Sequence, residues 1–126
     1  MGAEVALNPR ALFLLRSNNK NLSDQVAMIS KFSKELRKEV SGVVAKMGEA
    51  SDYSELAFAH ERATGVRLFG SDYNFDYART KTPTSGSRVA VVGGFGGLGL
   101  HVDDLHRGGG FDGVWAVPLV VPEAAR

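Results

Sequence analysis

Arg88-Val-Ala-Val-Val-Gly-Gly-Phe-Gly-Gly-Leu-Gly-Leu100 is the stretch from which the rest of the chain is interpreted. Its first part, Val89–Val92, is a short run rich in β-branched residues, which is typical of a buried strand. Its second part, Gly94–Gly99, matches the G-x-G-x-x-G pattern that lets a backbone approach a dinucleotide pyrophosphate. A nucleotide site at these glycines requires further elements around them.

The chain around the glycine pattern does not supply those elements. A dinucleotide-binding fold needs several parallel strands, and a helix must follow the glycines so that its N-terminus faces the pyrophosphate. Only a short segment separates the pattern from Gly108, and the residues before Arg88 have mainly helical periodicity. We therefore expect Gly93–Gly99 to be a flexible, glycine-rich connection without a cofactor. A nucleotide-binding loop at Gly94–Gly99 is the weaker alternative.

Composition and charge limit the classes of protein to which this chain can belong. Its 126 residues suit one domain, and 44% apolar and 23% charged residues are typical of a globular protein. The lack of cysteine excludes disulfides, cysteine-ligated zinc and thiol nucleophiles. The net charge of +1 favours no sequence-specific nucleic-acid partner, and we expect no membrane partner. We expect a single domain over 1–126, mainly helical over 1–65 and mainly strand and loop over 66–126.

Apolar residues at helical spacing predict helices in the first half. Asn8-Pro9 is a typical helix start, and we expect a short helix from there to about Ser17. Ser23 then caps a long amphipathic helix over 24–47, which stops at Gly48. Its apolar stripe consists of Val26, Ile29, Phe32, Leu36, Val40, Val43, Val44 and Met47.

The pattern changes from helix to strand after a third helix, which we expect over 51–64 with Gly65 as its stop. Aromatic and polar residues alternate over 73–77, which predicts a half-buried strand. A turn over 82–87 joins it to a second strand, Arg88–Gly93. We expect these two strands to form an antiparallel hairpin.

The last third combines a short helical segment with one more strand. His101–His106 is expected to form one or two helical turns, which Gly108–Gly110 ends. The final strand, Val114–Val121, is interrupted by Pro118, which cannot donate in a ladder and therefore favours a sheet edge. The predicted fold class is α+β, with N-terminal helices followed by a small antiparallel sheet with glycine-rich loops.

Three groups of residues have a chemical as well as a structural interpretation, and we favour the structural one for each. Metal ligation needs three or four converging ligands, and His101–His106 offers at most two by spacing. His60 lacks a nucleophile in any known pattern, so we expect a half-buried helix histidine. The aromatic residues over 73–77 are suited to base stacking, but Asp72 and Asp76 would repel phosphate. We expect no catalytic residue and no metal.

Four segments are similar to a known family. They are the opening helix Leu7–Leu12 leading into Leu15-Arg16-Ser17, the long amphipathic helix, the turn Ala63-Thr64-Gly65-Val66-Arg67 and the strand Ser87–Gly93. In this order they resemble the small neck and tail-completion proteins of long-tailed bacteriophages, which form rings at the head–tail junction. The resemblance covers residues 5–93.

The resemblance implies a non-enzymatic virion protein that works by ring assembly, with copies of itself and other virion proteins as its partners. Such a protein is assembled in the host cytoplasm. The alternative is a small partner-binding or regulatory subunit of a larger complex. An exposed edge strand and a loop that orders on assembly are suited to these contacts. The candidate contacts are Thr82, Pro83, Thr84, Ser85 and Gly86 in the turn, and Val114, Trp115, Val117, Leu119 and Val121 in the final strand.

Overall fold

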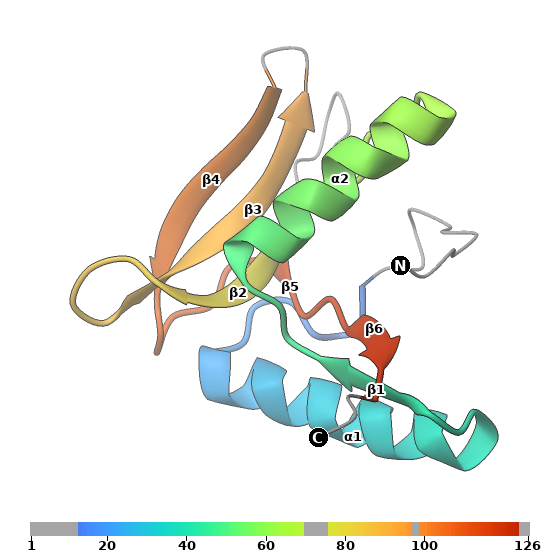
Figure 1. Ribbon diagram of the computed structural model, residues 1–126. Helices are drawn as coiled ribbons and strands as arrows, with labels where there is room; N and C mark the ends of the chain where they lie inside the picture. The colour runs from blue at the N-terminus through green and yellow to red at the C-terminus, as the bar shows by residue number, and fades with distance from the viewer. Residues whose placement is uncertain (1–12, 70–75, 97–98, 124–126) are drawn as a thin grey trace.

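The computed structural model describes residues 13–69, 76–96 and 99–123, and it shows an α+β fold (Figure 1). Its elements follow in the order α1 (Leu22–Glu39), β1 (Val43–Lys46), α2 (Ala50–Thr64), β2 (Tyr77–Pro83), β3 (Arg88–Gly96), β4 (Gly99–His106), β5 (Val114–Trp115) and β6 (Leu119–Pro122). In this part of the chain, neither helix is long and apolar enough to cross a membrane.

The helix α1 is shorter than its apolar stripe predicts. Its N-cap is Asn21 rather than the predicted Ser23. The Asn21 side chain accepts a hydrogen bond from the Asp24 amide in the first turn at 2.8 Å. It ends at Glu39, because the next residue is extended and Gly42 has a φ of +83°. The predicted helix over 40–47 is therefore wrong.

The strand β1 takes the place of the last part of that helix. It pairs antiparallel with β6, in a register that runs from Val43 opposite Pro122 to Lys46 opposite Leu119. Valine is β-branched and fits a paired strand better than a helix once a partner strand is available. That partner comes from the far end of the chain, so the local pattern could not identify it.

The helix α2 agrees with the prediction. Its N-terminus carries a capping box, in which Glu49 and Asp52 each accept a hydrogen bond from the other's backbone amide. It ends at Thr64, because Gly65 takes a left-handed φ of +77° that glycine adopts without steric cost.

A four-stranded sheet with the order β4-β3-β2-β5 forms the larger part of the fold. β2 and β3 form an antiparallel hairpin as predicted, but its first strand is Tyr77–Pro83, in place of a strand over 73–77 of which only 76–77 lie within the described residues, and Thr82 and Pro83 belong to β2 rather than to the turn. β5 pairs parallel with β2, so the sheet is mixed rather than purely antiparallel. The predicted strand Val114–Val121 is divided, since β5 joins this sheet and β6 joins β1.

Two further predictions are wrong at the β3–β4 hairpin. His101–His106 is not helical but lies in β4, which pairs antiparallel with β3. Gly93–Gly96 is not a loop, because it continues β3, and Gly99 opens β4. Glycine suits this end of the sheet for a steric reason: a Cβ on Gly93 would lie 2.0 Å from the Asp76 carbonyl oxygen.

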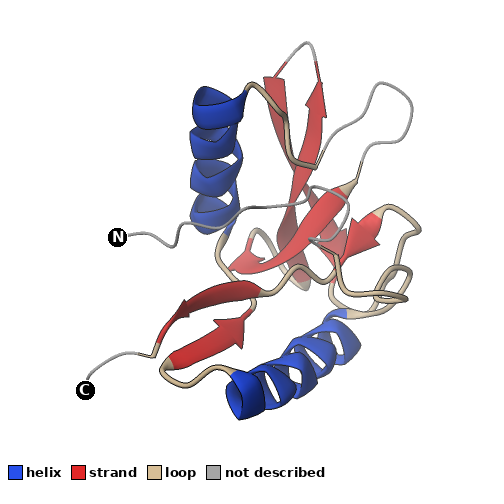
Figure 2. Cartoon of the chain, turned by 90° about the vertical axis from the view of Figure 1, so that its right-hand side faces the viewer, coloured by secondary structure: helices blue, strands red, loops and turns tan. Residues whose placement is uncertain are grey.

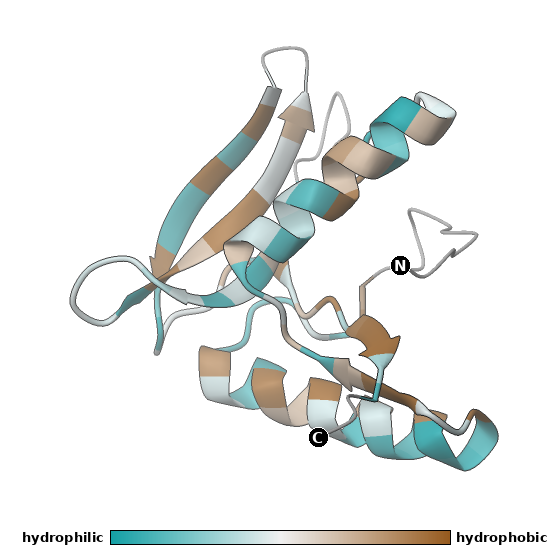
Figure 3. Cartoon of the chain, viewed as in Figure 1, coloured by the Kyte–Doolittle hydropathy of each residue, from teal (hydrophilic) through white to brown (hydrophobic). Residues whose placement is uncertain are grey.

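The helix α2 packs against this sheet and buries the main apolar core (Figure 2). The core consists of Tyr53, Ala57, Leu68, Phe69, Ala78, Val92, Phe95 and Val117. The Tyr53 hydroxyl accepts from the Gly48 amide at 2.9 Å and donates to the Val117 carbonyl at 2.6 Å. A second cluster lies where α1 packs on β1, and it consists of Ile29, Ala45, Met47 and Ala116. Figure 3 shows apolar residues along β3 and on α1.

A buried arginine joins the loops on the other side of β2. Arg79 is completely buried, and its guanidinium donates to the Gln25 Oε1 at 2.7 Å and to the Lys20 and Gly109 carbonyls at 2.8 and 2.6 Å. A fourth bond reaches the His106 carbonyl at 3.3 Å. Burial lowers the pKa of Arg79. No carboxylate in the described part of the chain pairs with this cation. Carbonyl oxygens accept its hydrogen bonds in place of water.

The segment 13–17 is not the helix that Asn8-Pro9 predicts, and residues 8–12 lie outside the described residues. It lies beside Ala116, the residue that follows β5, instead. The Leu14 amide donates to the Ala116 carbonyl at 3.0 Å, and the Ser17 Oγ accepts from the Ala116 amide at 2.9 Å. Phe13 also stacks on Trp115, with 5.2 Å between the ring centroids.

Candidate functional site

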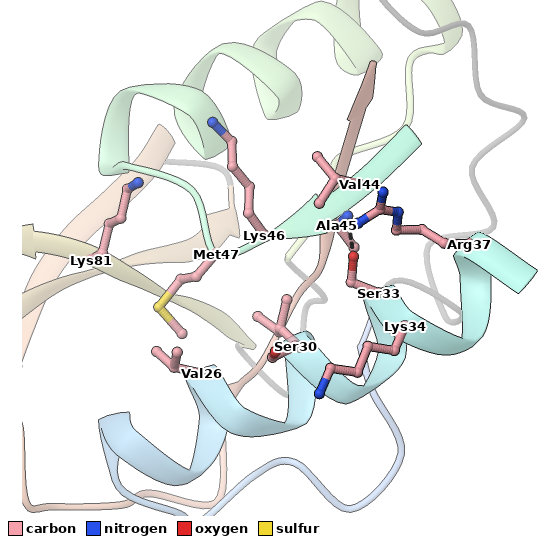
Figure 4. A pocket seen from close by; sticks show the side chains of 11 residues that line it. Val26, Ser30, Ser33, Lys34, Arg37, Val44, Ala45, Lys46, Met47 and Lys81 are labelled. Carbon is pink, nitrogen blue, oxygen red and sulfur yellow. Dashed lines mark hydrogen bonds between the residues drawn. The ribbon is translucent and has the colours of Figure 1, made fainter. Parts of the chain in front are cut away.

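A groove lies between α1 and β1, with a volume of about 440 Å³ (Figure 4). Eleven residues line it: Val26, Ile29, Ser30, Ser33, Lys34, Arg37, Val44, Ala45, Lys46, Met47 and Lys81. We call this hollow the basic groove. Its volume is within the range of protein sites that bind a ligand or a short peptide segment.

Helical spacing and one hydrogen bond build the groove. On α1, positions three and four apart share a face, so Val26, Ile29 and Ser33 line one wall. β1 supplies much of the opposite wall, and the Ala45 amide donates to the Ser33 Oγ at 2.9 Å. This bond is buried, so it fixes the floor where the two walls meet.

Positive charge gathers around the groove. Four of its lining residues are cationic and none is acidic, in a chain whose net charge is only +1. Lys34 and Arg37 come from α1, whereas Lys46 and Lys81 come from β1 and β2, and in Figure 4 the side chains of Lys46 and Lys81 extend away from α1. Among the described residues, Arg37 pairs with the exposed Glu123 at 2.8 Å, while Lys34 and Lys46 form no ion pair.

The floor of the groove is aliphatic. Ile29, Ala45 and Met47 are buried, whereas Val26 is exposed at the rim. No aromatic side chain lines the groove, so it offers no surface for stacking a base. The combination of an aliphatic floor and cationic walls suits a ligand that carries both apolar groups and carboxylates.

The glycine pattern does not lie in the setting that a dinucleotide site requires. Gly94-Phe95-Gly96 belongs to β3 and Gly99 to β4, and these strands are antiparallel neighbours. The pattern therefore leads from strand to strand, and no helix N-terminus follows it to face a pyrophosphate. The structure gives the nucleotide alternative no support at this position.

The histidines do not converge on a metal site. His101 and His106 are separated by an odd number of positions on β4, so they lie on opposite faces of the strand. Within the described ranges, no three His, Asp or Glu side chains are grouped to hold a metal ion. His60 is a partly buried residue of α2. Tyr73 and Phe75 lie outside the described residues, and Tyr77 begins β2.

The predicted assembly contacts fall into two groups. Pro83, Thr84, Ser85 and Gly86 are exposed at the end of the β2–β3 hairpin, and Thr82 is partly exposed within β2. In the final strand, Val114 and Val117 are buried inside the chain, whereas Trp115, Leu119 and Val121 are partly exposed. The segment 13–17 also lies beside Ala116, the residue that follows β5. The accessible candidates are therefore the hairpin turn and β6.

An open sheet edge that the sequence did not indicate lies at β4. The Arg107 amide donates to the Ser87 carbonyl at 2.8 Å, so alternate residues of β4 bond toward β3. By this alternation, the backbone groups of Val102 and Asp104 point away from the sheet. Those of Asp104 are occupied, by the Arg88 guanidinium and by a neighbouring side chain. Within the described ranges no hydrogen bond from a side chain occupies the outward backbone groups of Val102, and 58% of this residue is exposed.

Comparison of the chain with protein-family models, curated proteins and solved structures finds no match.

Proposed function

We propose that this protein is a non-enzymatic structural subunit that assembles with copies of itself and with other proteins. The proposed setting is the head–tail neck or tail end of a virion, where it forms part of a ring after assembly in the host cytoplasm. The resemblance described above suggests this setting, and the observation that carries the assembly role is the open edge of β4.

An open edge suits assembly because unpaired backbone groups bind another strand. Val102 directs its N–H and C=O outward and exposes its side chain beside them. At the other edge, Gln25 donates to the Val114 carbonyl of β5, and Leu14 donates to the carbonyl of Ala116, the residue after β5. A neighbouring strand therefore has one accessible place to add to the four-stranded sheet within the described residues.

The exposed hairpin turn lies beside this edge. The Thr84 hydroxyl donates to the Asp104 carboxylate at 3.1 Å, which joins the turn to β4. The Arg88 guanidinium holds the same carboxylate at 2.8 Å and lowers its pKa. The predicted turn contacts and the β4 edge thus form one continuous surface for a neighbour.

A substitution at Val102 tests the assembly role. Val102→Lys places a charge beside the open backbone groups, which natural edge strands use to prevent pairing. Multi-angle light scattering over a range of concentrations should show assembly of the wild type and a shift of Val102→Lys to monomer. Phe111→Lys is the matched control, because Phe111 is 64% exposed in the loop before β5 and does not belong to β4. It should assemble like the wild type.

A wild type that stays monomeric at all concentrations, or a Val102→Lys variant that assembles unchanged, would contradict self-assembly through β4.

The second candidate function is a small partner-binding or regulatory subunit of a larger complex. The basic groove favours this candidate, because its positive charge and apolar floor are suited to an acidic partner protein rather than to another copy of this chain. A monomer that binds another protein through the groove would support it.

A further inference from the structure

We propose that the basic groove binds an acidic segment of a partner protein, in which carboxylates alternate with aliphatic side chains. This inference goes beyond the assembly role and does not depend on the β4 edge. It rests on the groove's length, the distribution of its cations and the nature of its floor.

The length of the groove suits an extended peptide. Val26 and Arg37 stand at the two ends of the α1 wall, eleven residues apart. At 1.5 Å per helical residue this wall is about 16 Å long. An extended segment of about five residues, at 3.3 Å each, spans the same distance.

The cations are distributed so that several carboxylates are needed to satisfy them. Lys34 and Arg37 lie on the α1 wall, and Lys46 and Lys81 lie across the groove (Figure 4). A fatty acid has one carboxylate and would engage one end of this arrangement. Lys46 and Lys81 are exposed, and their long side chains can turn toward a bound segment that has acidic residues at alternate positions.

The existing ion pairs at the rim do not block such a ligand. Glu123 pairs with Arg37 at 2.8 Å, and Glu49 approaches Lys81 at 3.9 Å. All four of these side chains are substantially exposed. Exposed pairs of this kind contribute about 0–1 kcal/mol, so a carboxylate of the ligand can take the place of Glu123 or Glu49.

The floor argues for a peptide and against a nucleic acid. The rim residue Val26 is 45% exposed and provides an aliphatic contact for a leucine, isoleucine or valine side chain of a partner, above the nearly buried Ile29 and Met47. A nucleic acid would use aromatic surfaces for its bases, and none lines the groove.

Peptide selection tests the inference with the full chain. A library of random seven-residue peptides should be enriched for Asp and Glu interspersed with Leu, Ile or Val. The enriched peptide is then titrated by fluorescence anisotropy against wild type and Lys34→Glu/Lys46→Glu. Each reversal replaces an attraction by a repulsion, so the double variant should bind about 30-fold more weakly or worse. Binding to the wild type should also weaken as salt is raised.

The control variant has the same change of charge outside the groove. Lys31 and Lys38 are exposed on α1 and do not line the hollow, so Lys31→Glu/Lys38→Glu should bind within about threefold of wild type. Enrichment of peptides without acidic residues would overturn the inference, as would equal weakening by both double variants. Tighter binding of oleate or of a single-stranded oligonucleotide, lost in Lys34→Glu/Lys46→Glu, would assign the groove to that ligand instead.

Discussion

Replacement of the buried Arg79 by methionine tests how this fold holds its loops together. Four hydrogen bonds of the guanidinium reach Gln25 and three backbone carbonyls, and these come from α1, the loop before it and the segment around 106–109. Arg79→Met keeps an apolar stem in the same space and removes every donor. The bonded oxygens then lose their partner, and the Gln25 Oε1 is fully buried.

The expected loss of stability is the difference between two large terms. Hydrogen bonds from a charged donor contribute about 1.5–3 kcal/mol each, so the four together contribute about 6–12 kcal/mol. Burial of the cation without a carboxylate costs several kcal/mol, which the substitution recovers. We therefore expect Arg79→Met to lower the free energy of unfolding by about 3 kcal/mol, and the melting temperature of a chain of this size by about 10 °C.

Urea unfolding monitored by tryptophan fluorescence measures this effect. Trp115 is the one tryptophan of the chain, and its indole stacks on Phe13 and donates to Asp76 at 3.1 Å, so its emission reports on the folded state. Arg88→Met is the control, because Arg88 forms an exposed ion pair that contributes about 0–1 kcal/mol. If Arg79→Met unfolds within 1 kcal/mol of the wild type, the cost of burying the cation cancels its bonds and the reasoning is wrong.

Two further substitutions address the core and the glycine-rich end of the sheet. Tyr53→Phe leaves a buried amide and a buried carbonyl without their partner and should cost about 2 kcal/mol in urea unfolding. Burial raises the pKa of Tyr53, so its contribution is present below the unfolded pKa of about 10 and is lost as pH rises toward the folded value. Wild type should therefore lose stability above about pH 10, and the phenylalanine variant should lose less; an equal loss would refute this assignment. Gly93→Ala should prevent folding as judged by circular dichroism, because the added Cβ meets the Asp76 carbonyl. Gly86→Ala is its control: the added Cβ meets open space, and the φ of +57° should cost about 1 kcal/mol of stability. Normal folding of Gly93→Ala would contradict the close approach of β2.

The basic groove shows why a site can be absent from a sequence-based prediction. Lys34 and Arg37 belong to a polar helix face of ordinary composition, whereas Lys46 lies in the next element, β1, and Lys81 lies in β2, the third element after α1. No spacing rule connects these positions. The charges become one site only because α1 packs beside β1 and β2 ends close to both.

By itself, the sequence determined the elements that depend on neighbouring residues. The helix α2 was predicted because acidic residues stabilise its first turn and Gly65 ends it, and the strand at Arg88–Gly93 because its β-branched run is typical of a buried strand. The tertiary structure decided the segments whose partners are distant. Val43–Lys46 has helical spacing but becomes a strand because β6, from the far end of the chain, pairs with it. His101–His106 differs, because its partner β3 is next to it in the sequence, and Gly93–Gly96 continues that strand instead of forming the expected loop. A local pattern records propensity, whereas pairing with a distant strand supplies the backbone hydrogen bonds that override it.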